Sequence, residues 1–227
     1  MTISVKSTKR DTHYVKISVY GMAGVGKTVL CSTAPRPLII SAEAGLLSLA
    51  DKDIPVIEID SLGELREAYA FVEAHGAAFD TICLDSVSDI AEQVLDAKMA
   101  DYQKLADEKG GKMDPRQGYG AMAIEMMKLT RAFRALNKHI VFTAKQGMVQ
   151  DQVANALRFG PMLPGQVYTN NFPYLMDIVC CLRMSKEGKR YLQTQPDFQY
   201  LAKDRSGRLN DMEKPNLTEL FQKVLPA

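Results

Sequence analysis

The chain has 227 residues, 46% of them hydrophobic and 24% charged, which suits a single α/β domain with a sizeable core. It carries 28 Lys and Arg residues against 27 Asp and Glu, and the net charge of +1 excludes a global field that attracts nucleic acid, leaving local basic patches for that purpose. Four cysteines without CxxC spacing, and no apolar run near the roughly 18 residues of a spanning helix, predict a cytoplasmic protein without a membrane partner.

Hydrophobic periodicity predicts alternating strands and helices after a polar tail at residues 1–13. In chain order we expect a strand at 14–20, a helix at 27–34, strands at 37–41 and 56–60, a helix at 61–76, a strand at 79–85, helices at 87–105 and 119–138, and a strand at 139–144. Ser61, followed three residues later by Glu64, forms a capping box at the start of the helix that ends at Gly76. The charged, glycine-bearing stretch 106–118 is expected to be a loop.

The last third of the chain has a different organisation. Residues 146–171 are polar and without a clear period, so a long loop is expected there. Strands are predicted at 174–184, 189–195 and 198–204, and a final helix at 216–224. The order of elements predicts an α/β fold with a mostly parallel central sheet flanked by helices and antiparallel strands near the C-terminus. We expect one domain at 14–227, preceded by the tail at 1–13.

Residues 21–28 read GMAGVGKT, which has the P-loop pattern GxxxxGK[ST]. Glycines let successive backbone N–H groups point at phosphate oxygens, while Lys27 would reach the β- and γ-phosphates and the Thr28 hydroxyl would bind Mg²⁺. A chance match has a probability of about 1% over a chain of this composition. The pattern therefore predicts an ATP cradle formed by Gly21, Met22, Ala23, Gly24, Val25, Gly26, Lys27, Thr28 and Val29.

Two acidic residues follow predicted strands at the edge of the sheet where ligands bind in such folds. Asp85 ends the stretch TICLD and is interpreted as the carboxylate that holds the metal together with Thr28; a helix cap is the alternative. The residue after Asp85 is Ser86 rather than Glu, so the base that activates water must lie elsewhere. Glu43, directly after the strand at 37–41, is the candidate, and a solvated glutamate at a helix start is the alternative.

The stretches SVYGMAGVGKT, LIISAEAG and TICLDSVSDI together resemble the RecA/Rad51-type recombinase core, a P-loop ATPase. This resemblance implies a RecA-like fold and a catalytic role for Glu43. It also implies a polar sensor residue at Lys145 or Gln146, which would respond to the nucleotide. The mobile DNA-binding loops of that family would fall at 106–118 and 147–170, with these residues as DNA contacts: Lys109, Lys112, Arg116, Tyr119, Arg158 and Phe159.

Near the end of the chain, YLAKDRSG resembles the cation pair of that family that reaches the γ-phosphate of a neighbouring protomer. The pair would be Lys203 and Arg205. Residues i and i+2 of a strand share a face, so both charges can aim at one target while Asp204 points away. Two solvated charges beside a turn are the alternative. On the helix at 119–138, Lys128, Arg131, Arg134 and Lys138 recur on one face, where a solvated surface is favoured over DNA contact.

The ordered set of P-loop, LPGQ, FPYLMD and KDRSG is similar to the small phage-encoded, RecA-like proteins of the Sak-type single-strand annealing group, over about residues 14–224. The resemblance implies a DNA-dependent ATPase that uses ATP and Mg²⁺, binds single-stranded DNA, and promotes annealing or homologous recombination in the cytoplasm of a bacterial host. It further implies a ring or helical filament with ATP between protomers, for which the tail at 1–13 could serve as an arm. A single-strand-binding protein is a further expected partner.

Other functions remain open at the level of sequence. One is a non-hydrolysing annealing or loading module in which ATP only orders the assembly. Others are a packaging or helicase-loading ATPase and a nucleotide kinase. The kinase would need a lid with several arginines, and the stretch 106–118 holds only one.

Overall fold

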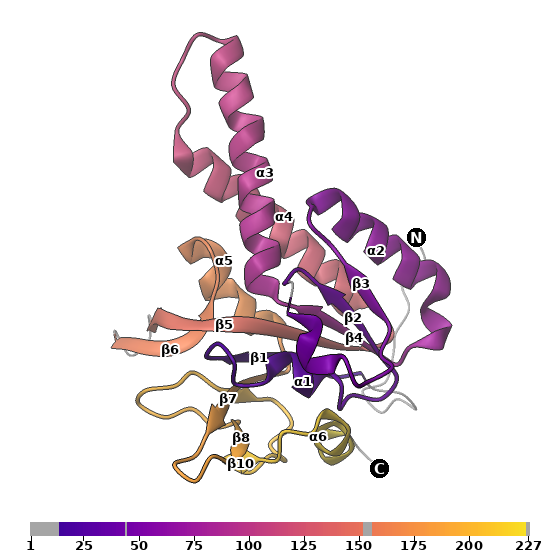
Figure 1. The fold of residues 1–227 in the computed structure, drawn as a ribbon. Coiled ribbons are helices and arrows are strands. Elements are labelled where there is room, and N and C mark those ends of the chain that lie inside the picture. The colour runs from indigo at the N-terminus through magenta and orange to yellow at the C-terminus, as the bar shows by residue number, and fades with distance from the viewer. Residues whose placement is uncertain (1–13, 44, 152–155, 226–227) are drawn as a thin grey trace, which may run out of the picture.

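The computed structural model describes residues 14–43, 45–151 and 156–225, so the tail at 1–13 lies outside the described residues. The strands are β1 Lys16–Gly21, β2 Pro37–Ser41, β3 Val56–Glu58, β4 Thr81–Asp85, β5 His139–Asp151, β6 Ala156–Met162, β7 Ile178–Met184, β8 Arg190–Gln193, β9 Lys203–Asp204 and β10 Met212–Glu213. They form one sheet in the order β10-β8-β7-β1-β5-β4-β2-β3, with β6 beside β5 and β9 beside β7 (Figure 1). The six strands from β7 to β3 are parallel, whereas β6, β8, β9 and β10 pair antiparallel.

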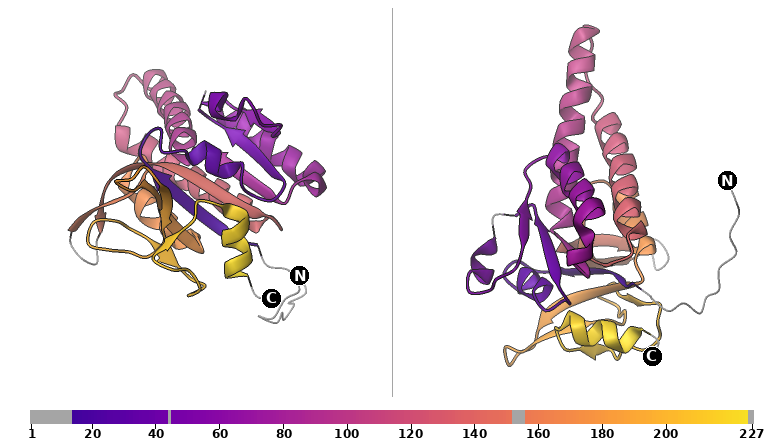
Figure 2. Two further views of the ribbon diagram at one scale, coloured as in Figure 1. Left: turned by 60° about the horizontal axis from the view of Figure 1, so that its bottom comes forward. Right: turned by 90° about the vertical axis from the view of Figure 1, so that its right-hand side faces the viewer.

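Helices cover both faces of this sheet (Figure 2). They are α1 Lys27–Cys31, α2 Leu62–His75, α3 Val87–Glu108, α4 Pro115–Ala135, α5 Gln166–Asn171 and α6 Leu217–Val224, with short 3₁₀ turns at Leu46–Leu49, Gly76–Ala78 and Phe172–Leu175. Neighbouring strand residues point to opposite faces, so Ile40 and Leu84 join a core with α2 to α5, and Ile39 and Cys83 join a core with α1 and α6. The predicted fold class is therefore confirmed.

The start of α2 has the predicted cap at Ser61. Ser61 Oγ accepts a hydrogen bond from Glu64 N at 3.2 Å, and Glu64 Oε2 accepts one from Asp60 N at 2.6 Å. The first bond satisfies a backbone N–H group that the helix start leaves without an intrahelical partner. The second binds the N–H of Asp60, one residue before the cap, and not the N–H of Ser61 as in a standard capping box.

The expected loop at 106–118 is mostly helical, which corrects the sequence interpretation. Helix α3 continues to Glu108 and α4 begins at Pro115, so only residues 109–114 connect them. Asp114 caps α4 by accepting a hydrogen bond from Arg116 N, and proline is tolerated at the first helical position because no N–H is needed there. We call α3, this turn and α4 the projecting hairpin, because it extends away from the sheet (Figures 1 and 2).

The expected long loop at 146–171 is also wrong. Strand β5 continues to Asp151 and pairs with β6 in an antiparallel hairpin, and α5 follows. Gly147 and Gly160 face each other across this hairpin, and a Cβ at Gly160 would lie 2.7 Å from Val149 Cγ2. The glycines therefore mark a close approach of side chains within a strand pair rather than a loop.

The C-terminal strands are shorter than predicted. Residues 172–175 form a 3₁₀ turn before β7, and of the expected strand 198–204 only β9 pairs with β7. Asp197 accounts for this difference, because its side chain accepts hydrogen bonds from Gln199 N and Tyr200 N and holds a turn there. Strand β10 was not predicted. Among the described residues, no helix is long and apolar enough to cross a membrane.

Candidate nucleotide-binding site

The predicted P-loop connects β1 to α1 at the carboxyl end of the central strand. Gly24 and Gly26 adopt φ values of +72° and +102°, which residues with a side chain rarely adopt. Gly21 allows a close approach, because a Cβ there would lie 2.8 Å from Leu182 O. Lys27 Nζ bridges the loop, donating to Gly21 O and Met22 O at 3.2 Å each. The loop thus has the curled backbone and the amine that a phosphate cradle requires.

Thr28 and Asp85 are joined at the centre of the site. Thr28 Oγ1 donates to Asp85 Oδ2 at 2.6 Å, and Asp85 Oδ1 accepts a hydrogen bond from Thr143 Oγ1. Asp85 is only 1% exposed. A hydroxyl and a carboxylate side by side fit Mg²⁺, which takes oxygen ligands and usually keeps waters and substrate phosphates as the others. Among the described residues, no group of three or more His, Cys, Asp or Glu side chains is arranged to hold a metal ion.

Glu43 lies beside this pair because the ends of β2 and β4 are tied together. Ala42 N donates to Asp85 O at 2.8 Å, and Ser41 Oγ donates to Glu43 O at 2.7 Å. Burial raises the pKa of Glu43 to about 6, and the neighbouring Asp89 and Asp85 carboxylates add to the shift. A half-buried carboxyl group with such a pKa is suited to accept a proton near neutral pH.

Asp89 is a neighbour of Glu43 that the sequence analysis did not assign. Burial acts to raise the pKa of Asp89, but hydrogen bonds with Glu43, Lys145 and Ser86 outweigh it and lower that pKa. The spacing could have signalled its place, because Ser86 and Asp89 have the [ST]-x-x-[DE] spacing of a helix start, and Ser86 Oγ caps Asp89 N. Asp89 links Glu43 to the first turn of α3.

The two candidate sensor residues lie on opposite faces of β5. Lys145 Nζ contacts Asp89 Oδ1 at 2.6 Å and Glu92 Oε2 at 3.2 Å, which brings it into the Glu43 cluster. The Gln146 side chain instead accepts a hydrogen bond from Cys181 Sγ at 3.5 Å. Because adjacent strand residues alternate in direction, only Lys145 faces the candidate base.

Arg190 is a second residue that sequence reasoning missed. Its Nε donates to Val25 O at 2.7 Å, and a Cβ at Gly26 would lie 3.2 Å from that nitrogen. Strand β8 carries it there because β8 pairs with β7, which lies next to β1. No spacing in the sequence indicates this contact, since it depends on the order of strands in the sheet.

Lys203 and Arg205 lie away from the P-loop of their own chain. Lys203 pairs with Val179 near the start of β7, whereas the P-loop follows the other end of the parallel neighbour β1. Lys203 Nζ donates to Pro173 O and Met176 O at 2.9 and 2.6 Å, and Arg205 Nη2 donates to Tyr174 O at 3.0 Å. Both cations turn to one segment of their own chain, although Arg205 lies in the turn after β9 and not on the strand that was expected there.

Asp204 points elsewhere, as the strand period predicts. Its carboxylate accepts hydrogen bonds from Ser206 N at 2.8 Å and Leu209 N at 3.0 Å, so it holds the turn that follows β9.

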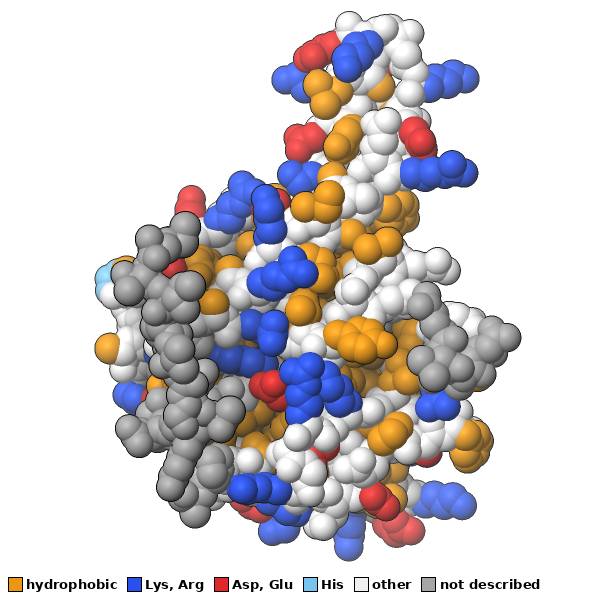
Figure 3. All heavy atoms as spheres, turned by 180° about the vertical axis from the view of Figure 1, so that it is seen from behind, with side chains coloured by type: hydrophobic (Ala, Val, Ile, Leu, Met, Phe, Trp, Pro, Cys, Tyr) orange, Lys and Arg blue, Asp and Glu red, His pale blue; other side chains and the backbone are white. Residues whose placement is uncertain are grey.

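The expected DNA contacts form two separate groups. Lys109 and Lys112 lie on the turn of the projecting hairpin, and Arg116 and Tyr119 lie on the first turns of α4. Tyr119 is 43% exposed. Figure 3 shows Lys and Arg side chains on the end of this hairpin and along the side below it.

The other group is on β6 rather than in a loop. The Phe159 ring packs against Tyr200 with centroids 5.1 Å apart, and Arg158 Nη1 donates to Asp197 O at 2.9 Å. Both side chains therefore have contacts within the chain.

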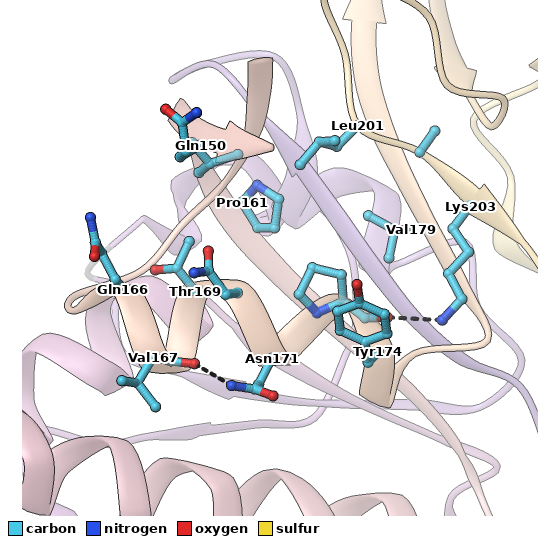
Figure 4. Close-up of a pocket in the computed structure, with 14 residues that line it drawn as sticks. Gln150, Pro161, Gln166, Val167, Thr169, Asn171, Tyr174, Val179, Leu201 and Lys203 are labelled. Carbon is cyan, nitrogen blue, oxygen red and sulfur yellow. Dashed lines mark hydrogen bonds between the residues drawn. The ribbon is translucent and has the colours of Figure 1, made fainter. Parts of the chain in front are cut away.

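A cavity of about 690 Å³ lies between the β5–β6 hairpin, α5 and the segment before β9 (Figure 4). No P-loop residue lines it. Lys203 lies at one end, and the rest of the wall is rich in amide and hydroxyl side chains, including Gln150, Gln166, Thr169 and Asn171.

The mostly parallel sheet, the P-loop after β1 and the Asp85 carboxylate at the end of β4 define a P-loop nucleotide-binding protein. The chain matches a family described as an AAA domain, AAA_24, over residues 13–206, and it belongs to this family. No curated protein sequence matches the chain. Among solved structures it is similar to a KaiC-like protein of the hyperthermophilic archaeon Pyrococcus horikoshii, with 13% identity, 83% of this chain and 82% of that chain covered, and a TM-score of 0.43.

Proposed function

We propose that this protein hydrolyses ATP, binds single-stranded DNA and promotes annealing or homologous recombination. The observation that carries the nucleotide chemistry is the Thr28–Asp85 hydrogen bond of 2.6 Å beside the Lys27 loop, because it places a metal-binding hydroxyl and carboxylate at the mouth of a phosphate cradle. The annealing role, the phage origin, the host cytoplasm and the single-strand-binding partner rest on the order of motifs along the chain.

In the proposed reaction, Lys27 and the loop amides hold the phosphates, and Glu43 takes a proton from the attacking water. Bound Mg²⁺ would neutralise phosphate charge, with Thr28 and Asp85 as its protein partners. The Asp89 carboxylate adds to the raised pKa of Glu43, so a change at Asp89 would alter how readily Glu43 accepts a proton from water. Lys145, which is paired with Asp89, is placed to respond to that change.

The placement of Lys203 and Arg205 supports an assembly of several copies. Because β9 lies toward the end of β7 away from the P-loop, these cations are better placed for a nucleotide held by a second copy. Such cations stabilise the charge that develops on the transferred phosphoryl group. A ring or a helical filament with ATP between protomers would use them in this way.

Single-stranded DNA is expected to bind at the tip of the projecting hairpin. Cations that track the backbone, together with aromatic rings that stack on bases, are the features such proteins use. Lys109, Lys112, Arg116 and Tyr119 provide this combination on an element that extends from the sheet. On β6, Arg158 could still contact phosphates, whereas one side of the Phe159 ring is occupied by Tyr200.

The test is ATP turnover with and without single-stranded DNA for the wild type and for Glu43→Gln. We expect DNA to stimulate the wild type and the variant to lose on the order of 100-fold in turnover while still binding nucleotide, because general base catalysis contributes about that much. Glu58→Gln is the matched control, since Glu58 ends the neighbouring strand β3 and is exposed. Normal turnover by Glu43→Gln would place the base elsewhere.

A second candidate is an annealing module in which ATP orders the assembly without turnover, and the influence of Asp89 on Glu43 favours it. Strand annealing that requires ATP, proceeds equally with a non-hydrolysable analogue and is unchanged in Glu43→Gln would select this candidate.

A further inference from the structure

The Asp177 carboxylate, directly before β7, has contacts with β1 and with the turn after β9. Lys16 N donates to Asp177 Oδ2 at 3.0 Å, and Arg205 Nη1 lies 3.3 Å from Asp177 Oδ1. Arg205 is thus the positive side chain that contacts Asp177, whereas Lys16 contacts it through its backbone N–H. Asp177 acts on the Lys16 and Lys203 amines only electrostatically.

Arg134, in the last turn of α4, adds a fourth positive charge. Lys16 Nζ donates to Leu136 O at 2.8 Å, which brings its amine to the end of the helix that carries Arg134. Burial lowers the pKa of Lys16 and of Lys203 to about 8, and the Arg134 guanidinium adds to both shifts. Its Nε is buried and has no hydrogen-bond partner among the described residues. A buried charged donor without an acceptor is costly, and such groups usually indicate a missing partner.

We propose that Lys16, Arg134, Lys203 and Arg205 form a receptor for a phosphate oxyanion. We call these four residues the phosphate receptor. The assignment of Arg134 and Lys16 goes beyond the cation pair discussed above, and it accounts for the buried Arg134 Nε that has no hydrogen-bond partner among the described residues.

The free donors of the phosphate receptor match the acceptors of a phosphate. Lys16 Nζ donates to Leu136 O and Lys138 O, and Lys203 Nζ donates to two carbonyls, so each ammonium keeps one N–H for a ligand. A phosphate offers several oxygens and can accept from both amines and a guanidinium together. Lys203 also lines the cavity of about 690 Å³, so its amine borders open space (Figure 4).

The source of the phosphate follows from the proposed function, on which this step of the inference rests. If ATP is held between copies, the phosphate receptor of one copy faces the nucleotide of the next. The other source is a nucleic-acid phosphate, because Lys and Arg side chains continue along this side of the molecule from the projecting hairpin (Figure 3). Both sources present the same oxyanion.

The first experiment measures calorimetric binding of tripolyphosphate to full-length protein carrying Lys27→Ala, which removes the P-loop as a competing site. We expect Arg134→Gln in this background to weaken binding about tenfold, the effect of losing one charge-assisted hydrogen bond. Arg131→Gln is the matched control, since Arg131 is exposed on the same helix and carries the same charge. Equal affinity of the two variants for tripolyphosphate would overturn the proposal.

Two further variants keep the proposal testable if Arg134→Gln unfolds, which thermal unfolding would reveal. Arg205→Gln alters a side chain that is 49% exposed and should also weaken tripolyphosphate binding. Asp177→Asn removes the carboxylate that competes with the ligand and should strengthen binding. Unchanged binding by both variants would contradict the phosphate receptor.

Two experiments distinguish the two possible sources of the phosphate, the nucleotide of a second copy and a nucleic acid. Arg134→Gln protein is mixed with Lys27→Ala protein, so that an intact P-loop can meet an intact phosphate receptor only across two copies. Restored ATP turnover supports a nucleotide of the second copy. Loss of oligothymidylate binding by Arg134→Gln, without restored turnover, supports a nucleic-acid phosphate. Tripolyphosphate binding is measured without any ATP turnover. Loss of the proposed ATPase function therefore leaves this measurement unaffected, and a failure of the phosphate receptor can be recognised separately.

Discussion

At the scale of single residues, Asp85 shows how a buried carboxylate can be kept ready for a metal. It is almost fully buried, yet Thr28 and Thr143 each donate a hydroxyl hydrogen bond to it. Hydrogen bonds to the charged form stabilise it against the cost of burial. Thr28 therefore has two roles, as a partner of Asp85 and as an expected magnesium ligand.

Two substitutions of Thr28 separate the effect of its hydroxyl group on nucleotide binding from the effect of its side-chain shape. We expect Thr28→Val to weaken binding of Mg²⁺-ATP about tenfold, the cost of one lost charge-assisted interaction, and Thr28→Ser to bind nearly as the wild type does. The measurement is titration with a fluorescent ATP analogue, in Mg²⁺ and in EDTA. If Thr28→Val loses as much affinity in EDTA as in Mg²⁺, the hydroxyl acts on the fold of the loop and not on the metal.

At the scale of elements, the projecting hairpin depends on close packing of α3 against α4. A Cβ at Gly118 would lie 2.4 Å from Met99 Sδ, whereas at Gly120, half a turn further along α4, nothing lies within 4 Å. Glycine is a poor helix former, so its presence at 118 reflects the close approach of the two helices.

The two glycines offer a matched pair of substitutions. Gly118→Ala should lower the free energy of unfolding by about 1 kcal/mol or more, because overpacking outweighs the gain in helix propensity. Gly120→Ala should raise it by up to about 1 kcal/mol, because alanine favours the helix and meets no neighbour. Denaturant unfolding of both variants checks the signs, and stabilisation by Gly118→Ala would show that Met99 moves aside freely.

At the scale of the whole molecule, His139 joins the sheet to the layer of α6. Its Nδ1 accepts a hydrogen bond from Val15 N at 3.1 Å, and its ring stacks on Phe221 with centroids 4.3 Å apart. Burial lowers the pKa of His139 to about 4, and the Lys16 ammonium adds to the shift. The folded protein therefore holds this histidine neutral well below the pH at which the unfolded chain protonates it.

The sign of the resulting pH dependence follows from linkage. His139 is neutral in both states above pH ~6.5, and as the pH falls toward 4 the unfolded state binds a proton that the folded state does not. The free energy of unfolding should therefore fall over this window, by up to about 3 kcal/mol from this group. Urea unfolding from pH 7 to 4 should show a shallower fall for His139→Gln than for the wild type, with exposed His75→Gln as the control. Identical slopes for all three would show that His139 is protonated in the folded state.

The elements that the sequence predicted well have strong local signals. The N-cap at Ser61, the apolar strand 37–41, the buried strand 79–85 and the GMAGVGKT pattern each depend on neighbouring residues. The regions 106–118 and 146–171 were wrongly interpreted as loops because glycine and charge are common to loops, exposed helix ends and hairpin strands. At those positions the contact of Gly118 with Met99, or of Gly147 with Gly160, decides the structure.

The sequence by itself determined the α/β class, the phosphate cradle and the positions of Thr28, Asp85 and Glu43, because these follow from short-range chemistry and from the ends of predicted strands. Only the tertiary structure decided that Lys145 pairs with Asp89, that Arg190 lies on the P-loop and that the Lys16 amine reaches the end of α4. Arg190 and Val25 are far apart along the chain, and they meet because β8, β7 and β1 are neighbours in the sheet. Strand order sets such contacts, and it results from the burial of both faces of the sheet as a whole rather than from any local pattern.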